Sequence, residues 1–246
     1  MPGYWRIQHD ALARSFVIDH QGYAETATDS GTSRDSVALR VIATVRRTAD
    51  GGVAGIVQSA VVRGPEGALT PLPGQSFPFA FSAAPYAGRG APRLVVQPPA
   101  ADPCATPAAA ALLPVEDLLF SIPDSVFPGL TWSDSSVTPV CRSGVRLSVF
   151  VVRTFHCRGL PSSDLTAGLV IDRTSHAVVT ATVVRGTDTT RVHGSGSGTM
   201  TLAVDPVTGA LLGATGTSQL DLTVRSATKI QQSRQTATIR ISPTGG

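Results

Sequence analysis

The sequence has little charge, few aromatic rings and no long apolar run. Of its 246 residues, 15% are charged and 5% are aromatic. Lys229 is the only lysine, and the arginines are scattered singly along the chain. A nucleic-acid-binding surface needs a basic stripe, commonly with interleaved aromatic residues. We therefore predict no nucleic-acid partner.

Membrane and leader signals are also missing. A membrane-spanning helix needs about 20 consecutive apolar residues, and no window of the chain approaches that length. The sequence therefore predicts no transmembrane segment. The first letters, M-P-G-Y-W-R-I-Q-H-D, lack the basic segment followed by an apolar one that is typical of a secretory leader. We expect no leader in this chain.

Cysteine is scarce, with Cys104, Cys141 and Cys157 as the three examples. Cys141 and Cys157 bracket an apparent strand, and at ~3.3 Å per residue an extended span would separate them by roughly 50 Å. That separation is far beyond disulfide reach, so any bridge includes Cys104. Cys141 is the better partner because both flank expected loops. We predict a Cys104–Cys141 disulfide and a free, buried Cys157; three reduced thiols are the alternative.

Catalytic and metal-binding patterns are absent from the sequence. Glu116 and Asp117 would diverge by ~100° on a helix, so they do not form a facing acid/base pair. Asp134 in T-W-S-D-S-S and Asp205 in D-P-V-T-G are assigned to turns. We assign the histidines to strand surfaces because none has H-x-H or H-E-x-x-H spacing: His9, His20, His156, His176 and His193. We expect a protein that is not an enzyme and has no metal and no cofactor.

Strand patterns dominate what is present. Val37 to Val45 places apolar residues at every second position, which is typical of a strand with one buried face. The letters T-A-D-G-G follow and then V-A-G-I-V-Q-S-A-V-V-R returns, which indicates a hairpin. Further strands are expected at 145–157, 165–184, 189–204, 211–224 and 235–242. Short turns between neighbours predict antiparallel pairing, and we expect one β-rich domain over residues 1–246.

The segment 104–123 departs from this pattern. Its letters A-T-P-A-A-A-A-L-L-P-V-E-D-L-L-F predict a helical insertion that is broken or kinked at Pro114. The segment is apolar almost all round, so we expect it to be buried.

The stretch G-S-G-S-G-T at 194–199 resembles a phosphate-binding loop only superficially. A dinucleotide fingerprint needs G-x-G-x-x-G before a helix, and a P-loop needs G-K-[ST]; both are absent. The nucleophile elbow G-x-S-x-G fails because Gly196 stands where its serine should be. On a strand, the three glycines share a face with Met200, and Gly216 continues that face on the returning strand.

A strand face without side chains predicts strong bending or the close approach of another body. We therefore expect a mainly β fold: a strongly curved antiparallel sheet, or half-barrel, with the short helical insertion on its concave side. The concavity either packs against the helix alone or leaves room for an apolar ligand. The cavity candidates are Gly194, Gly196, Gly198, Met200, Gly216, Leu112, Leu113, Leu118, Leu119 and Trp132.

Five stretches carry a family resemblance: P-G-L-T-W-S-D (128–134), R-T-F-H-C-R-G (153–159), G-S-G-S-G-T (194–199), D-P-V-T-G-A-L-L (205–212) and R-Q-T-A-T-I-R-I (234–241). In pattern, this part of the chain resembles the LolA/LppX-like half-barrels of bacterial envelope lipoprotein and lipid carriers. The resemblance implies a lipophilic cavity and a periplasmic or outer-membrane-associated location.

Three functions follow as hypotheses. The first is a non-catalytic envelope protein that binds or carries an apolar, lipid-like ligand in the curved sheet. The second is a structural accessory subunit that docks on a larger membrane protein complex. The third, well behind, is an unrecognised hydrolase. An open apolar cavity would favour the carrier, whereas a filled concavity would favour the accessory subunit.

Overall fold

In the computed structural model, the described residues are 4–9, 11–48, 52–63, 69–71, 77–84, 93–97, 112–118, 120–142, 145–161, 168–185 and 188–244. The elements, in chain order, are β1 (Trp5–Arg6), β2 (Arg14–Thr28), β3 (Gly31–Arg47), β4 (Val53–Arg63), β5 (Leu69–Pro71), β6 (Phe77–Ala84), β7 (Arg93–Gln97), α1 (Leu112–Glu116), β8 (Ser125–Val126), β9 (Thr131–Arg142), β10 (Val145–Gly159), β11 (Leu169–Arg185), β12 (Asp188–Val204), β13 (Leu211–Arg225) and β14 (Ile230–Pro243).

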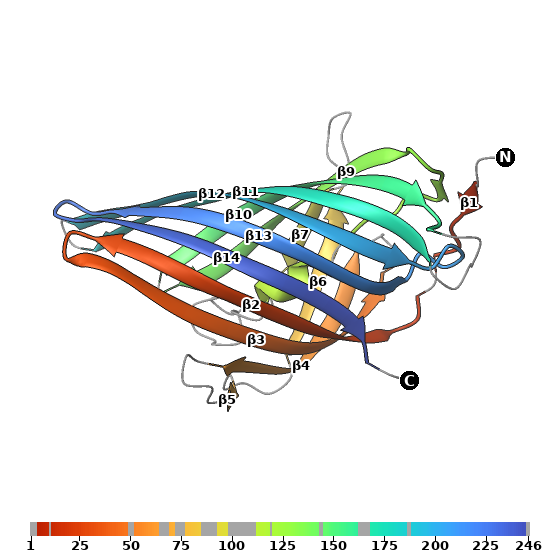
Figure 1. Cartoon of the computed structure of the whole chain (residues 1–246), viewed down its shortest axis with the longest axis horizontal. Coiled ribbons are helices and arrows are strands. Elements are labelled where there is room, and N and C mark those ends of the chain that lie inside the picture. The colour runs from red at the N-terminus through yellow and green to blue at the C-terminus, as the bar shows by residue number, and fades with distance from the viewer. Residues whose placement is uncertain are drawn as a thin grey trace.

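One large sheet dominates the molecule (Figure 1). Its 12 strands follow the order β3-β2-β14-β13-β12-β11-β10-β9-β7-β6-β4-β5. Every pairing in it is antiparallel except β7 with β9, which is parallel. β3, at one end of this order, also pairs with β4 near the other end. The sheet therefore curls until its two sides are hydrogen-bonded to each other.

The predicted fold class is confirmed: the chain is mainly β, with a strongly curved antiparallel sheet and one very short helix among the described residues. The curl continues beyond what the half-barrel prediction required, because β3 meets β4. No helix in the described part of the chain is long and apolar enough to cross a membrane.

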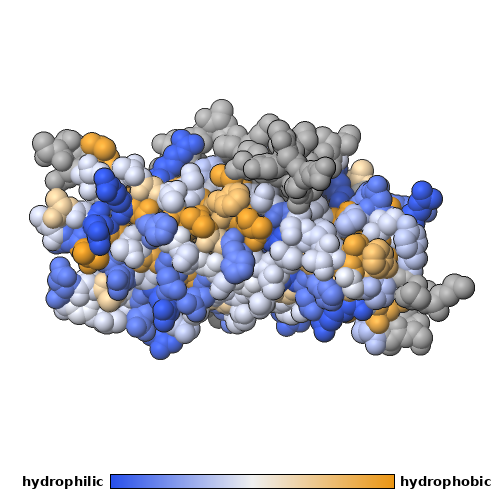
Figure 2. Space-filling view, turned by 90° about the horizontal axis from the view of Figure 1, so that it is seen from above, coloured by the Kyte–Doolittle hydropathy of each residue, from blue (hydrophilic) through white to orange (hydrophobic). Residues whose placement is uncertain are grey.

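The two faces of the sheet differ in polarity because side chains alternate along a strand. In β10, the odd-numbered residues from Leu147 to Cys157 face the interior and the even-numbered ones face outward. In β12, the even-numbered residues from Val192 to Val204 face the interior, so the predicted orientation of the glycine face is confirmed. On the face seen in Figure 2, apolar side chains form separate patches among polar ones.

The interior contains two apolar clusters. The larger one includes Val115 and Leu118, in and after α1, together with side chains from β2, β3, β4, β6 and β10–β14. The smaller one lies in β9–β13 and contains Val140, Leu147, Val149, Val179, Val192 and Leu222. The predicted burial of the helical segment is confirmed for its described residues, since Val115 is fully buried. Within the described residues the helix spans five residues, Leu112–Glu116, and residues 101–111 lie outside the described part.

A candidate ligand cavity inside the sheet

A partly open cavity of about 580 Å³ lies against the inner face of the sheet, and residues of both apolar clusters line it. Its aliphatic wall comes from β9, β10, β11 and β13: Val140, Leu147, Val149, Val151, Val179, Leu220 and Leu222. Pro114 and Glu116 of α1, and Asp117 after it, form another part of the lining. The volume is within the ~300–1,000 Å³ that is usual for small-molecule sites.

Small residues leave this space open. Gly22, Ala237, Ser218, Gly198 and Ser175 are successive cross-strand partners on β2, β14, β13, β12 and β11. All five have side chains of at most two heavy atoms, and four of them line the cavity together with residues next to them in sequence. Consecutive residues of one strand can line the same cavity only where the backbone itself forms the wall.

The glycines also have a second cause, in addition to the strong bending or the approach of another body that the sequence predicts. A Cβ on Gly196 would lie 2.8 Å from the carbonyl oxygen of Gln219 on β13. A Cβ on Gly194 would lie 2.7 Å from the carbonyl oxygen of Asp221. The neighbouring strand therefore approaches these positions too closely for any side chain.

The same row of cross-strand partners continues from β11 onto β10 and β9, where its residues form a buried ion-pair cluster. Ser175 pairs with Arg153 of β10, and Arg153 pairs with Asp134 of β9. Nη1 of Arg153 donates to Oδ1 of Asp134 at 3.1 Å, and Nη2 donates to Oε1 of Glu116 at 2.9 Å. Nη2 also donates to Oγ of Ser136 at 2.8 Å, and Ser136 donates to Glu116. The cluster fixes α1 to the inner face of the sheet.

The electrostatics of Arg153 follow from this arrangement. Burial alone would lower the pKa of the guanidinium, but the carboxylates of Glu116 and Asp134 outweigh that effect and raise the pKa above its usual value. Arg153 is 2% exposed, so its charge depends on these partners instead of water.

A second buried arginine lies one row further along the sheet. Nη2 of Arg173 donates to Oδ1 of Asp117 at 2.6 Å, and Nη1 donates to the carbonyl oxygen of Asp117 at 3.3 Å. The Nε–H of Arg173 is buried and has no hydrogen-bond partner among the described residues. Arg173 lines the cavity, but this Nε has almost no accessible surface.

His20 of β2 lines the cavity too, and its assignment to a strand surface was wrong. Burial lowers the pKa of its imidazole, and the nearby Asp117 carboxylate offsets part of that shift. The turn assigned to Asp134 was also wrong, because Asp134 is 1% exposed in the middle of β9. The turn at Asp205 is confirmed: its Oδ1 accepts the N–H groups of Val207 and Thr208.

The predicted cavity residues separate into groups. Gly196 and Gly198 line the cavity. Gly194 is buried and Gly216 partly buried on the same inward face, and Met200 and Leu118 belong to the larger apolar cluster. Trp132 stacks on Phe155 with ring centroids 5.3 Å apart and its Nε1 donates to the Ser121 carbonyl. The side chains of Leu112, Leu113 and Leu119 lie outside the described part. The binding role of these residues remains a prediction.

The cysteine predictions can be checked only in part. Cys157 is a free, buried thiol, as predicted. Burial raises the pKa of this thiol, and a backbone hydrogen bond from Gly159 offsets part of the rise. Cys104 and the side chain of Cys141 lie outside the described residues, so their bridge remains a prediction.

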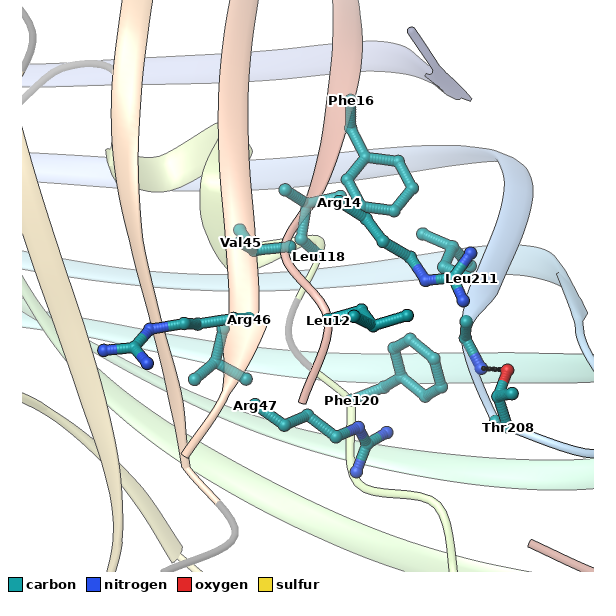
Figure 3. Close-up of a pocket in the computed structure, with 13 residues that line it drawn as sticks. Leu12, Arg14, Phe16, Val45, Arg46, Arg47, Leu118, Phe120, Thr208 and Leu211 are labelled. Atoms are coloured by element: carbon teal, nitrogen blue, oxygen red, sulfur yellow. Dashed lines mark hydrogen bonds between the residues drawn. The ribbon is translucent and has the colours of Figure 1, made fainter. Parts of the chain in front are cut away.

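A smaller cavity of about 60 Å³ lies where β2, β3 and the β12–β13 turn meet (Figure 3). Leu118, Phe120 and Leu211 form its apolar side, and Arg14 and Arg47 also line it. Figure 3 shows Arg46 extending away from the other labelled side chains. The volume has room for a few water molecules, so we assign no ligand to it.

Sequence reasoning missed the ion-pair cluster, although the sequence contains a signal for it. Arg153 occupies an inward position in the alternation V-R-L-S-V-F-V-V-R-T-F, and Arg173 does the same in L-V-I-D-R-T-S. A charged residue in the buried register of a strand needs a buried partner. Within the described residues, no group of three or more His, Cys, Asp or Glu side chains is placed to hold a metal ion.

Comparisons with known proteins give no family. No family model matches the chain, and no curated protein matches it. Among solved structures, Pseudomonas aeruginosa OccK2 (OpdF) in complex with glucuronate aligns with 7% identity and a TM-score of 0.28, over 96% of this chain and 100% of that one. Pseudomonas aeruginosa OpdQ aligns with 8% identity and a TM-score of 0.27, over 95% and 99% of the two chains. Neither likeness indicates a function.

Proposed function

We propose that the protein binds an apolar, lipid-like molecule in the cavity inside its curled sheet, without catalysing a reaction. The observation that supports this proposal is the cavity of about 580 Å³ with an aliphatic wall and a bare-backbone wall. Its aliphatic wall gives a hydrocarbon chain apolar surface to cover. Each methylene transferred there from water contributes ~0.8 kcal/mol.

The cavity favours a carrier over an accessory subunit. A sheet that served only as a docking scaffold would have no need of unfilled interior volume, and empty volume lowers stability. Here the row from Gly22 to Ser175 keeps large side chains out of the interior on five adjacent strands. That arrangement is what a ligand-binding interior requires.

The bacterial envelope setting belongs to the same proposal. Its support is the sequence resemblance to LolA/LppX-like carriers. An oxidising compartment would permit the predicted Cys104–Cys141 bridge. A lipid carrier of this kind would release its cargo to a membrane or to an envelope protein.

Binding of the neutral, environment-sensitive dye Nile red tests the proposal. The unmodified protein should enhance its fluorescence, and Ala177→Phe and Ala237→Phe should abolish the enhancement, because both alanines line the cavity and a phenyl ring would fill it. Val178→Phe is the matched control, since Val178 is 43% exposed on the outer face of the same strand as Ala177. Equal dye binding by all four proteins would contradict the proposal.

A further inference from the structure

The outer face of the sheet has a groove of about 740 Å³ that crosses β2, β14, β13, β12 and β11. Its side chains belong to outward positions of these strands. On β12 the exposed Ser197 and Thr199 line it, while Gly198 between them faces inward. The row from Gly22 to Ser175 lines both this outer groove and the cavity on the inner face. One layer of backbone therefore separates the two spaces, and a ligand in the outer groove would meet a different set of side chains.

Four threonines form a continuous cross-strand row in the outer groove: Thr174, Thr199, Thr217 and Thr238. All four residues are exposed. Neighbouring strands lie about 4.8 Å apart, so the hydroxyl-bearing side chains repeat at that interval across four strands. A ligand whose own hydrogen-bonding groups repeat along its length fits such a row.

The threonine row keeps unused hydrogen-bonding capacity. Oγ1 of Thr199 and Oγ1 of Thr217 lie 3.4 Å apart and share one hydrogen bond. Oγ1 of Thr238 donates to the carbonyl oxygen of Gln21 at 3.3 Å. Because a hydroxyl has one donor and two acceptor lone pairs, the Thr199–Thr217 pair keeps one donor and all three hydroxyls keep acceptor sites. A ligand group that both donates and accepts, such as another hydroxyl, uses this surface best.

The outer groove offers no net charge to an ionic ligand. No Asp, Glu, Lys or Arg is among the described residues that line it. The next outward row on each side, followed from β11 to β3, contains two arginines and two carboxylates. Some of these charges form ion pairs, as in Arg234–Asp221 at 2.8 Å and Arg40–Asp19 at 3.5 Å. A phosphate or carboxylate ligand would therefore meet no positive field that attracts it.

Tyr23 supplies an aromatic ring at the β2 end of the outer groove. It is 39% exposed, and the guanidinium carbon of Arg34 lies 4.0 Å from its ring centroid. This cation–π contact holds the ring in place. A tyrosine ring combines a rigid apolar surface with a polar hydroxyl. The groove thus matches a ligand that has apolar C–H faces as well as hydroxyls.

We propose that the outer groove binds an uncharged, linear oligosaccharide, which lies across the strands with its hydroxyls on the threonine row. Sugar hydroxyls both donate and accept, the sugar rings repeat along the chain, and their C–H faces can cover the ring of Tyr23. This inference goes beyond apolar-ligand binding and does not depend on it, because the side chains of Thr199 and Thr217 point away from the cavity on the inner face.

Isothermal titration calorimetry of the full chain tests the inference with three neutral probes, maltohexaose, cellohexaose and mannohexaose. Glucose and mannose are the single-ring controls, and the hexamer of galacturonic acid is the anionic control. At least one neutral hexamer should bind about tenfold or more tightly than its monosaccharide, because it contacts several positions of the row at once. It should also bind more tightly than the galacturonic acid hexamer.

A matched pair of double variants places the binding in the outer groove. Thr199→Val with Thr217→Val keeps two β-branched side chains on the strands and removes two hydroxyls. It should weaken the hexamer that binds by about tenfold or more. Thr201→Val with Thr215→Val is the control, since these exposed cross-strand partners occupy the next outward row of the same strands and do not line the groove. The control should bind as the unmodified protein does.

The outcomes separate this inference from the proposed function. Failure of all three neutral hexamers to bind, or tightest binding by the galacturonic acid hexamer, would overturn the oligosaccharide inference. Equal loss in the two double variants would overturn its placement in the outer groove. Nile red reports separately on the inner cavity: if the dye does not bind but a neutral hexamer does, the proposed function fails and this inference stands. If Thr199→Val with Thr217→Val does not fold, Ser197→Trp fills the groove in its place, with Ser195→Trp outside the lining as its control.

Discussion

Nη1 of Arg153 lies 3.1 Å from Oδ1 of Asp134, and the two residues are also cross-strand partners on β10 and β9. Oδ2 of Asp134 accepts the backbone N–H of Ser121 at 3.1 Å. The carboxylate thus joins the sheet to the segment that follows α1. Because the helix and the segment after it supply part of the cavity lining, this ion pair positions one side of the cavity.

Asp134→Ala should strongly destabilise the protein. The substitution leaves Arg153 buried with one carboxylate fewer, and breaking a buried ion pair costs about 3–5 kcal/mol. Urea unfolding at neutral pH measures the loss. Arg158→Gln, in the exposed pair with Asp172, should leave the unfolding midpoint nearly unchanged. A loss below about 1 kcal/mol for Asp134→Ala would show that the cluster does not hold the helix segment.

Gly196→Val should cost more than about 2 kcal/mol in the free energy of unfolding. Its Cβ would meet the Gln219 carbonyl oxygen at 2.8 Å and Cδ1 of Leu220 at 3.1 Å. Gly213→Ala is the control, because the nearest atom to a Cβ there is 3.4 Å away, an ordinary contact. Thermal unfolding of both variants measures the difference. If Gly196→Val melts with the unmodified protein, β12 and β13 are not closely packed at this point.

His20 should make the protein less stable in mild acid. Burial lowers the pKa of His20 in the folded state from its ordinary 6.5, so the unfolded chain binds the proton more readily. Its contribution is therefore fully present above about pH 6.5 and is lost as the pH falls through the lowered folded value. Asp117 is the carboxylate that faces it and offsets part of the shift.

His20→Gln measures this contribution. The free energy of unfolding should fall less for the variant than for the unmodified protein as the pH is lowered from about 7 to 5. Asp205 and Asp221, whose pKa values are lowered from 3.8, act at lower pH and so do not obscure this window. Parallel curves for the two proteins would show that His20 titrates as it does in the unfolded chain.

The thiols should differ in reactivity. Cys157 is fully buried and burial raises its pKa, so alkylation of the native protein should spare it and denaturant should expose it. Non-reducing peptide mapping should find Cys104 linked to Cys141. A link between Cys141 and Cys157, or three free thiols in protein from an oxidising compartment, would refute the pairing.

Much of the sheet could be predicted because its strands alternate strictly. The letters from Val145 to Cys157 place an apolar residue at nearly every odd position, and β10 follows them. The same period placed Gly194, Gly196 and Gly198 on the inward face. Local pattern is enough for these features because each depends on one strand or on one hairpin.

The cavity and its ion pairs could not be predicted in the same way. Arg153 meets Asp134 through the register of β10 with β9, and it meets Glu116 through the path of a segment 37 residues away in sequence. The pairs β2–β14 and β7–β9 also join distant parts of the chain. The register of β10 with β9 and the path of the segment that contains Glu116 depend on the packing of the whole sheet. No single stretch of sequence encodes that packing.

The most direct test of apolar-ligand binding is native mass spectrometry of the protein purified from its own host, followed by organic extraction and analysis of the extract. The account predicts an added mass that extraction removes, an extract that contains a molecule with an alkyl chain, and no added mass on Ala177→Phe. A ligand-free mass for the unmodified protein, together with no binding of Nile red, would contradict it.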